Sequence, residues 1–355
     1  MIVCSCIKEN FNADSIAEGK PALICLGYGS NSAEIIMTKG IMTELDEDRV
    51  NSLRVLVFDA ESGLLVTDQT FVGDQLKGKS AADNYSSGYV ELATTSGNRK
   101  IFGIANLVNN QDFTIDLSHV SNISDLESLT VTQNSKTVSR GANFLMTGWY
   151  NETDVMTSPS SADLKATVIN IPVGNSTEEH KRIKLSRLDS KVEFEFLVGN
   201  SGIDFTPLSY SVYNVPTMAY VSGYDDETGL AADLGAGYPY DANCFNTTPT
   251  NFDNASNSNA FGFYMMESNL MPVMSATTFA HRDLKDKGDD VNGIGAGTGA
   301  YDYEGGEWSG DWAYANKYST YVQVKGRIEY KNSADDFISA DAVYNITGKA
   351  GNRLC

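Results

Sequence analysis

The stretch Lys191–Val198 most restricts the fold of this chain, because apolar and charged side chains alternate along it. The apolar residues Val192, Phe194, Phe196 and Val198 share one side of an extended chain, and the charged residues Lys191, Glu193 and Glu195 share the other. A period of two is typical of a half-buried antiparallel strand. Because a domain-sized block of sequence lies on each side, we expect this strand to open the second of two β-domains. The charged run Glu178–Arg182 is expected to be the linker before it.

Length and composition favour an all-β chain of two domains. With 355 residues, the chain is long for one β-sandwich and sufficient for two. It contains 31 Gly, 18 Tyr and 15 Phe, residues that favour turns and strands. The predicted organisation is a tether over residues 1–20, a first antiparallel β-sandwich over 21–181 and a second over 182–355.

Further strands are predicted where short runs of β-branched and aromatic residues lie between turn residues. The run Pro21–Gly29 places Ile24, Leu26 and Tyr28 on one side of an extended chain. The acidic run Thr43–Asp48 suits the start of a short helix, and residues 107–140 a helical or loop insertion. The other predicted strands cover residues 53–58, 89–93, 100–106, 143–149, 166–171, 208–216, 261–269 and 321–330, and a last strand begins near 342.

The charge of the chain excludes one class of partner. The formal net charge is −20, and a surface this acidic repels phosphate backbones and anionic lipid. We therefore predict no nucleic-acid partner. The five cysteines are scattered and odd in number, which matches neither a disulfide framework nor the paired spacing of a metal site.

No constellation of residues predicts catalysis, a cofactor or a metal ion. The only histidines, His119, His180 and His281, lie in three separate segments, which leaves little for a catalytic triad or a histidine-rich metal site. The glycine-rich run 293–299 lacks the Gly-Lys-Ser/Thr ending of a phosphate-binding loop. The acidic residues at 286–292 lack a later Glu to complete a calcium cage. We therefore predict that the protein is not an enzyme.

Two other segments leave alternatives open. The aromatic residues between Tyr301 and Tyr314 suit either stacking on sugars or ordinary packing. At the N-terminus, Met1–Cys6 resembles the end of a bacterial lipoprotein signal, with Ser5 directly before a lipidated Cys6. The apolar region of such a signal is missing before it, so the start codon is placed too late or the likeness is accidental.

Several fragments together resemble the Bacteroidales fimbrillins, the FimA-like subunits of type V pili. In the first block they are Asp46–Phe58 closing on Gly63, Ile101–Asn106 and Phe144–Gly148. In the second block they are Lys184–Val192, Val212–Pro216 and Phe263–Asn269. The likeness spans about residues 20–347, and it is the order and spacing of the fragments that make it specific.

The resemblance implies an all-β fold of two transthyretin-like antiparallel β-sandwich domains in tandem and export to the cell surface as a lipoprotein lipidated at Cys6. It also implies cleavage by a surface protease after Lys39, where relatives commonly carry Arg, which leaves Gly40 as the new N-terminus. The first strand, carrying Leu23, Ile24, Leu26 and Tyr28, would then leave. A C-terminal strand from the next subunit would fill the groove, a process called donor-strand exchange.

The sequence thus predicts a structural subunit of a cell-surface fimbrium at the outer membrane, with other fimbrial subunits as partners. The short polar end Gly348–Cys355 leads us to expect that the donor strand is absent, through truncation or because this is a terminal subunit. The alternative is a surface-anchored or tip adhesin that binds a glycan or host protein, as a receptor, through loops 223–260 and 288–314. A secreted glycan-degrading enzyme ranks third.

Overall fold

The computed structural model consists almost entirely of β-strands. The described residues are 17–30, 47–79, 85–141, 143–151, 166–195, 202–222, 244–252, 260–266, 302–304, 307–309, 320–332 and 334–347. Within these ranges the helical elements are a 3-10 turn, η1 (Gly73–Gln75), and one short helix, α2 (Ile123–Glu127). The predicted all-β class is confirmed.

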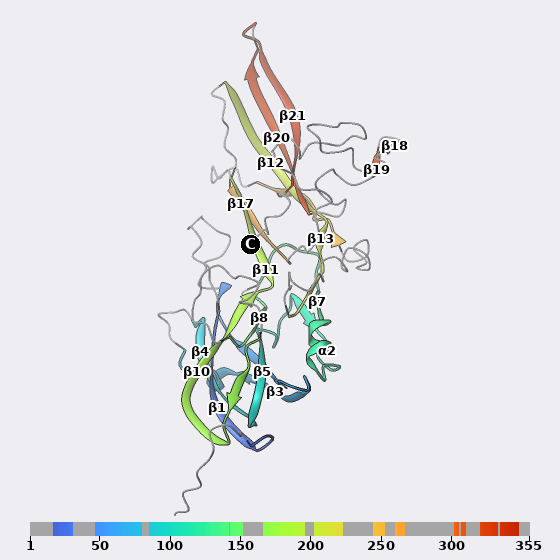
Figure 1. The fold of residues 1–355 in the computed structure, drawn as a ribbon. Coiled ribbons are helices and arrows are strands. Elements are labelled where there is room, and N and C mark those ends of the chain that lie inside the picture. Colours follow the sequence, from blue (N-terminus) through green and yellow to red (C-terminus); the bar gives the residue numbers. More distant parts are fainter. Residues whose placement is uncertain are drawn as a thin grey trace, which may run out of the picture.

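The N-terminal part forms an eight-stranded sheet in the order β3-β2-β5-β8-β10-β1-β4, with β9 added beside β5. The strands are β1 (Pro21–Ser30), β2 (Ser52–Asp59), β3 (Leu65–Val72), β4 (Ser87–Thr95), β5 (Gly97–Ala105), β8 (Met146–Trp149), β9 (Ile169–Ile171) and β10 (Gly174–Arg187). Strand β10 pairs with β1 along most of its length and with β8 only through Ser186 and Arg187. It therefore connects two layers, β4-β1-β10 and β3-β2-β5-β8, which pack as a sandwich (Figure 1).

Both faces of the β2-β5-β8 layer are buried. One face meets β1 and β4 in the main core of the sandwich. The other face carries Phe58, Phe102 and Trp149 and packs against the insertion predicted at 107–140. That insertion contains β6 (Phe113–Ile115), α2 and β7 (Thr130–Gln133). Burial on both faces explains why residues 53–58 read as a continuous apolar run broken only by Arg54, which pairs with Asp68 on β3.

The C-terminal part contains a four-stranded sheet, β16-β12-β20-β21, and a separate pair, β11-β17. These strands are β11 (Asp189–Glu195), β12 (Ile203–Tyr213), β16 (Thr250–Asn251), β17 (Ala260–Met266), β20 (Tyr321–Lys331) and β21 (Phe337–Thr347). Apolar residues of both sheets meet in a third cluster that includes Val212, Phe263 and Val324. Strands β12, β20 and β21 extend to the end of the molecule opposite β1 (Figure 1).

Short pairs complete the described structure. Strand β14 (Met218–Tyr220) adds to β7 and so joins the C-terminal part to the insertion of the N-terminal part. The remaining pairs are β13 (Val215–Pro216) with β15 (Cys244–Phe245) and β18 (Asp302–Glu304) with β19 (Glu307–Ser309).

The charged linker predicted at Glu178–Arg182 is wrong, because these residues lie inside β10 and pair with β1. The backbone groups of β1 need partners on this side, and β10 supplies them whatever its side-chain charge. The chain leaves the N-terminal sheet later, at Leu188, between β10 and β11. Here the Asp189 carboxylate accepts two hydrogen bonds from Arg140, at 2.8 and 2.9 Å. We propose this point as the division between the two sandwiches, in place of the predicted division between residues 181 and 182.

Two of the predicted strands are longer than expected. Strand β12 begins at Ile203, five residues before the predicted start, and includes Pro207, beside which its pairing with β20 shifts register. Strand β21 begins at Phe337 rather than near 342, and it pairs with β20 over its whole length. This outer strand is exposed on much of its surface, Phe337 to 65%, so its start is not marked by a buried apolar face.

Glu47, from the acidic run predicted to start a short helix, is buried where the two parts of the chain meet. Its carboxylate pairs with Arg187 at the end of β10 and, at 3.0 Å, with the Lys191 ammonium on β11. It also accepts a 2.6 Å hydrogen bond from the Tyr264 hydroxyl on β17. Burial, followed by this hydrogen bond, raises the pKa of Tyr264 above its usual value. We call these four side chains the Glu47 cluster.

Candidate strand-exchange site

Strand β1 lies inside the β4-β1-β10 layer and has a partner on each side. It runs parallel to β10, with Ala22 opposite Gly174 and Ser30 opposite Leu185. It runs antiparallel to β4, with Pro21 opposite Thr95. If this strand left, both neighbours would expose a row of unpaired backbone groups, which is the arrangement that binds an added strand.

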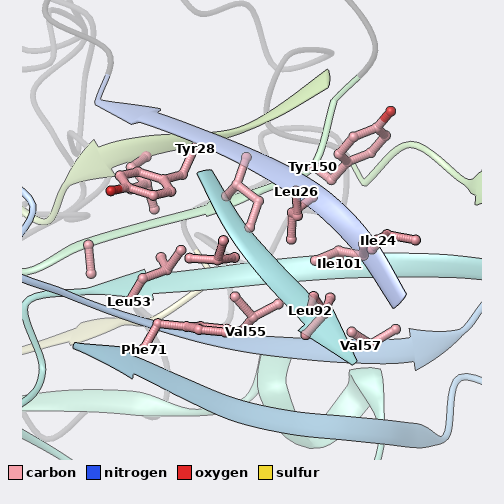
Figure 2. Close-up of a cluster of buried hydrophobic side chains, with 14 of the residues drawn as sticks. Ile24, Leu26, Tyr28, Leu53, Val55, Val57, Phe71, Leu92, Ile101 and Tyr150 are labelled. Atoms are coloured by element: carbon pink, nitrogen blue, oxygen red, sulfur yellow. The ribbon is translucent and has the colours of Figure 1, made fainter. Parts of the chain in front are cut away.

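The inward face of β1 is fully buried. Ile24, Leu26 and Tyr28 are each 0% exposed and point into the main core (Figure 2). They meet side chains of β2, β4 and β5 that are also buried, among them Val55, Leu92 and Ile101, as Figure 2 shows. Burial of Ile24 and of Leu26 contributes about 1.5–3 kcal/mol each. The strand therefore fills a deep apolar groove.

A glycine shapes the part of the groove that holds Tyr28. A Cβ atom added to Gly88 on β4 would lie 2.6 Å from the Tyr28 hydroxyl oxygen and 2.5 Å from the backbone oxygen of Lys77. Both distances are shorter than real Cβ contacts. Glycine at this position therefore leaves the space that the hydroxyl end of the Tyr28 ring occupies.

A second glycine fixes the strand on the other side of the groove. A Cβ atom on Gly148 of β8 would lie 1.6 Å from the backbone oxygen of Lys184 on β10. The two backbones therefore approach one another more closely than any side chain permits, at the point where β10 passes from one layer to the other. This contact sets the position of the parallel partner of β1.

The structure places the predicted site residues as follows. Ile24, Leu26 and Tyr28 share the inward face as expected, whereas Leu23 lies on the opposite face and is half-buried. The predicted lipidation site, Cys6, and the predicted processing site at Lys39 and Gly40 lie outside the described residues. The segment that contains Lys39 directly follows β1 in the chain.

Most of the loops proposed for the adhesin alternative also lie outside the described residues. Within 223–260 the structure describes the end that carries β15 and β16, and within 288–314 it describes the pair β18-β19. In the described ranges no group of three or more His, Cys, Asp or Glu side chains is placed to hold a metal ion. No helix within them has the length and apolar character needed to cross a membrane.

The fold and the groove define a class of protein, a β-sandwich whose inner strand precedes a predicted processing site. Comparison with known families is more specific. Residues 36–187 match the family model described as "Major fimbrial subunit protein (FimA)". The fimbrillin resemblance predicted from the sequence is therefore confirmed over this segment. The segment begins after β1 and ends at Arg187, the last residue of β10.

Solved structures give a weaker likeness. The tip fimbrial protein Mfa3 from Porphyromonas gingivalis is 13% identical, with a TM-score of 0.43, over 90% of this chain and 81% of that chain. A putative cell adhesion protein from Parabacteroides distasonis is also 13% identical, with a TM-score of 0.48, over 92% and 80%. A fimbrial protein from Bacteroides vulgatus is 10% identical, with a TM-score of 0.34, over 91% and 90%. No curated protein matches the chain in sequence.

Proposed function

We propose that the protein is a structural subunit of a cell-surface fimbrium, a type V pilus, assembled by protease-triggered donor-strand exchange at β1. The observation that carries this proposal is the position of β1, which fills an apolar groove between two strands and precedes the segment with the predicted cleavage site. The family match supports it, because the matched residues 36–187 exclude β1. A strand outside the matched segment is a natural candidate for replacement by a strand of another subunit.

In this proposal, cleavage after Lys39 frees residues up to 39 from a chain that now begins at Gly40. A strand from a neighbouring subunit then occupies the place of β1, pairs with β4 and β10 and buries its own apolar side chains in the groove. The partners are other fimbrial subunits. Before cleavage, a lipid on Cys6 holds the subunit at the outer membrane.

The runner-up is a surface-anchored or tip adhesin that binds a glycan or host protein through loops of the C-terminal part. The groove around β1 does not favour it, because an adhesin has no need for a removable inner strand. The two functions differ in their products, since a subunit forms polymers of regular spacing and an adhesin retains its ligand as a monomer.

An engineered disulfide between β1 and β4 would test the proposal directly. Cys25 on β1 lies opposite Glu91 on β4 in the antiparallel pair. Directly opposite positions of such a pair have Cα atoms about 4.5–5.5 Å apart, within the range of a disulfide. A Glu91→Cys chain should therefore tie β1 to β4 when oxidised and release it when reduced.

The experiment treats the full chain with a lysine-specific protease in the presence of other subunits of the same fimbrium, which supply donor strands, and follows intact mass and the ladder of polymers on native gels. We expect a new N-terminus at Gly40 and polymers for the unaltered chain and for reduced Glu91→Cys. We expect retained β1 and no polymers for oxidised Glu91→Cys. Glu91→Ser, under oxidising conditions, is the matched control and should polymerise. Polymers that form equally well with β1 locked would contradict the proposal, and so would a cleaved chain that stays monomeric.

A further inference from the structure

The segment just before β1 is tied to the turn between β4 and β5 by a network of backbone hydrogen bonds. The Gly19 amide donates to the backbone oxygen of Ser96 at 3.1 Å, and the Ser96 amide donates to the backbone oxygen of Lys20 at 2.7 Å. The Lys20 amide donates to the Ser96 hydroxyl oxygen at 3.0 Å, and that hydroxyl donates in turn to the backbone oxygen of Ala17. This end of the strand is held more closely than β-pairing alone requires.

Within this network the Glu18 carboxylate has a defined place. It accepts a 2.9 Å hydrogen bond from Nη2 of Arg99 and a 3.2 Å hydrogen bond from the Asn98 amide. It lies directly over Gly97, where an added Cβ atom would be only 2.0 Å from a carboxylate oxygen. Gly97 also has a φ of +125°, a conformation that other residues rarely adopt. We call Gly97, Asn98 and Arg99 the carboxylate socket.

The socket belongs to the sandwich and does not depend on β1 for its shape. Arg99 is 2% exposed, and its guanidinium also donates to Asp59 at 2.7 Å and to Thr95 at 3.2 Å. Both of these partners lie on strands that stay in place when β1 leaves. Glu18, by contrast, is 56% exposed and arrives with β1. The departure of β1 would therefore remove the Glu18 carboxylate from Nη2 of Arg99 and from the Asn98 N–H, while Asp59 still holds Nη1 of Arg99 in place.

Backbone pairing in the groove does not determine the direction of an incoming strand. Because β10 is parallel to β1 and β4 is antiparallel, a strand in either direction has one parallel and one antiparallel neighbour. A shift of one residue would turn every apolar side chain out of the groove. The socket lies at one end of the groove only, beside the N-terminal end of β1. It can therefore fix both direction and register.

We propose that the carboxylate socket recognises an acidic side chain on the strand that occupies the groove. In this chain the side chain is that of Glu18, which lies just before β1 and four residues before the first inward-facing residue, Ala22. A donor strand from another subunit would carry an Asp or Glu at the equivalent place, ahead of its alternating apolar residues. This inference rests on the proposed function, because it names the chemistry that selects the donor strand.

The chemistry of the socket suits this role. A carboxylate that accepts from an arginine and a backbone N–H makes charge-assisted hydrogen bonds, which are stronger and more directional than neutral ones. Replacing Glu18 by Gln keeps the size of the side chain and removes its charge. Since a hydrogen bond to a charged group contributes more than a neutral one, and Glu18 is half-exposed, we expect Gln to weaken strand binding about tenfold.

The first measurement uses the full chain with a sequence-specific protease site inserted between Lys39 and Gly40. After cleavage under reducing conditions, fluorescent peptides of residues 17–30 compete for the groove. We expect the Glu18→Gln peptide to bind about tenfold more weakly than the native peptide. The matched control is Lys20→Gln, which changes an exposed charge outside the socket and should bind within about twofold of the native peptide. Equal binding of the native and Glu18→Gln peptides would overturn the inference and leave strand exchange intact.

The second measurement separates failure of the socket from failure of strand exchange. If no peptide enters the groove, the proposed function is wrong, and the socket is then judged in the uncut chain. There, Glu18→Gln should speed amide hydrogen exchange several-fold at Ala22 and Ile24, close to the socket, and leave the amide of Tyr28 unchanged. Unchanged exchange at all three amides would show that the socket does not hold the strand.

Discussion

The substitution Leu26→Ala tests whether β1 is a stabilising part of the uncleaved fold. Leu26 lies in the middle of the strand, opposite Val90 of β4 and His180 of β10, and is 0% exposed. Truncation removes three heavy atoms from the main core, where the facing strands β2 and β5 are each paired on both sides and cannot easily collapse into the space.

The magnitude follows from this environment. Leucine-to-alanine changes in well-packed cores destabilise proteins by about 2–5 kcal/mol, and a site with little freedom to relax belongs in the upper half of that range. We therefore expect a loss of roughly 3–4 kcal/mol in the free energy of unfolding of the N-terminal sandwich. The same strand provides its own control, since Leu23 is the same residue type on the half-buried outer face. Leu23→Ala should cost less than about 1.5 kcal/mol.

The assay is urea unfolding of the full chain, followed by tryptophan fluorescence, because Trp149 on β8 packs against Phe102 on the neighbouring strand β5 of the N-terminal sheet. Because both variants replace Leu by Ala in the same strand, comparing them cancels the effects that this change has on strand propensity and on the unfolded state. Equal losses for the two variants would refute the reasoning, since they would mean that the inward face of β1 contributes no more than its outer face. A small loss for both would mean that β1 is bound only weakly before cleavage.

Three further predictions concern other parts of the structure. Gly148→Ala places a methyl group against a backbone oxygen of β10 and should destabilise the protein by about 3 kcal/mol. The control Gly141→Ala meets only an ordinary contact and should change the free energy of unfolding by less than about 0.5 kcal/mol. Equal effects of the two variants in thermal unfolding would contradict the close approach of the β8 and β10 backbones. Glu47→Gln removes the nearest carboxylate from Arg187 and Lys191, whose next carboxylates are Asp48 at 4.0 Å and Glu193 at 3.4 Å, and should cost about 3 kcal/mol. Asp68→Asn, in the more exposed pair with Arg54 of β2, should cost less than about 1 kcal/mol. Similar losses for the two variants in urea unfolding would show that the Glu47 cluster does not stabilise the junction. Hydrogen bonds from the serine before helix α2 hold the pKa of Asp125 below its ordinary value of 3.8. Because the folded pKa is lower than the unfolded one, the stability that this carboxylate provides is complete above about pH 4 and is lost as the pH falls through the folded pKa. The difference in the free energy of unfolding between the native chain and Asp125→Ala should therefore shrink at acid pH. A difference that stays constant with pH would refute the assignment.

The local pattern of the chain predicted individual strands better than their partners. Alternation from Lys191 onward identified residues 191–195 of β11, and the apolar run at 21–29 correctly placed Ile24, Leu26 and Tyr28 on one face. Such patterns depend only on which side of an extended chain a residue faces. The charged residues 178–182 misled the prediction because strand pairing joins backbone groups, which these residues carry whatever their side chains.

Residues that act through distant contacts gave no signal in the sequence. Glu47 was part of an acidic run expected to start a short helix, and it is buried because residues 140 and 217 positions away supply its partners. Glu18 belonged to a polar tether, and its role depends on Arg99, 81 positions later. Arg99 itself carries no motif. A buried cation can be found only when the fold shows that the groups around it are shielded from water.

The sequence by itself determined the all-β class, the inward face of the first strand and the fimbrillin likeness, because these follow from short-range periodicity and from fragments in a fixed order. The tertiary structure decided that β1 lies between a parallel and an antiparallel neighbour, that β10 replaces the expected linker, and that a buried arginine holds Glu18. The physical reason is that pairing, burial and ion contacts are formed between residues far apart in the chain. Their energies depend on which groups the fold brings together and removes from water.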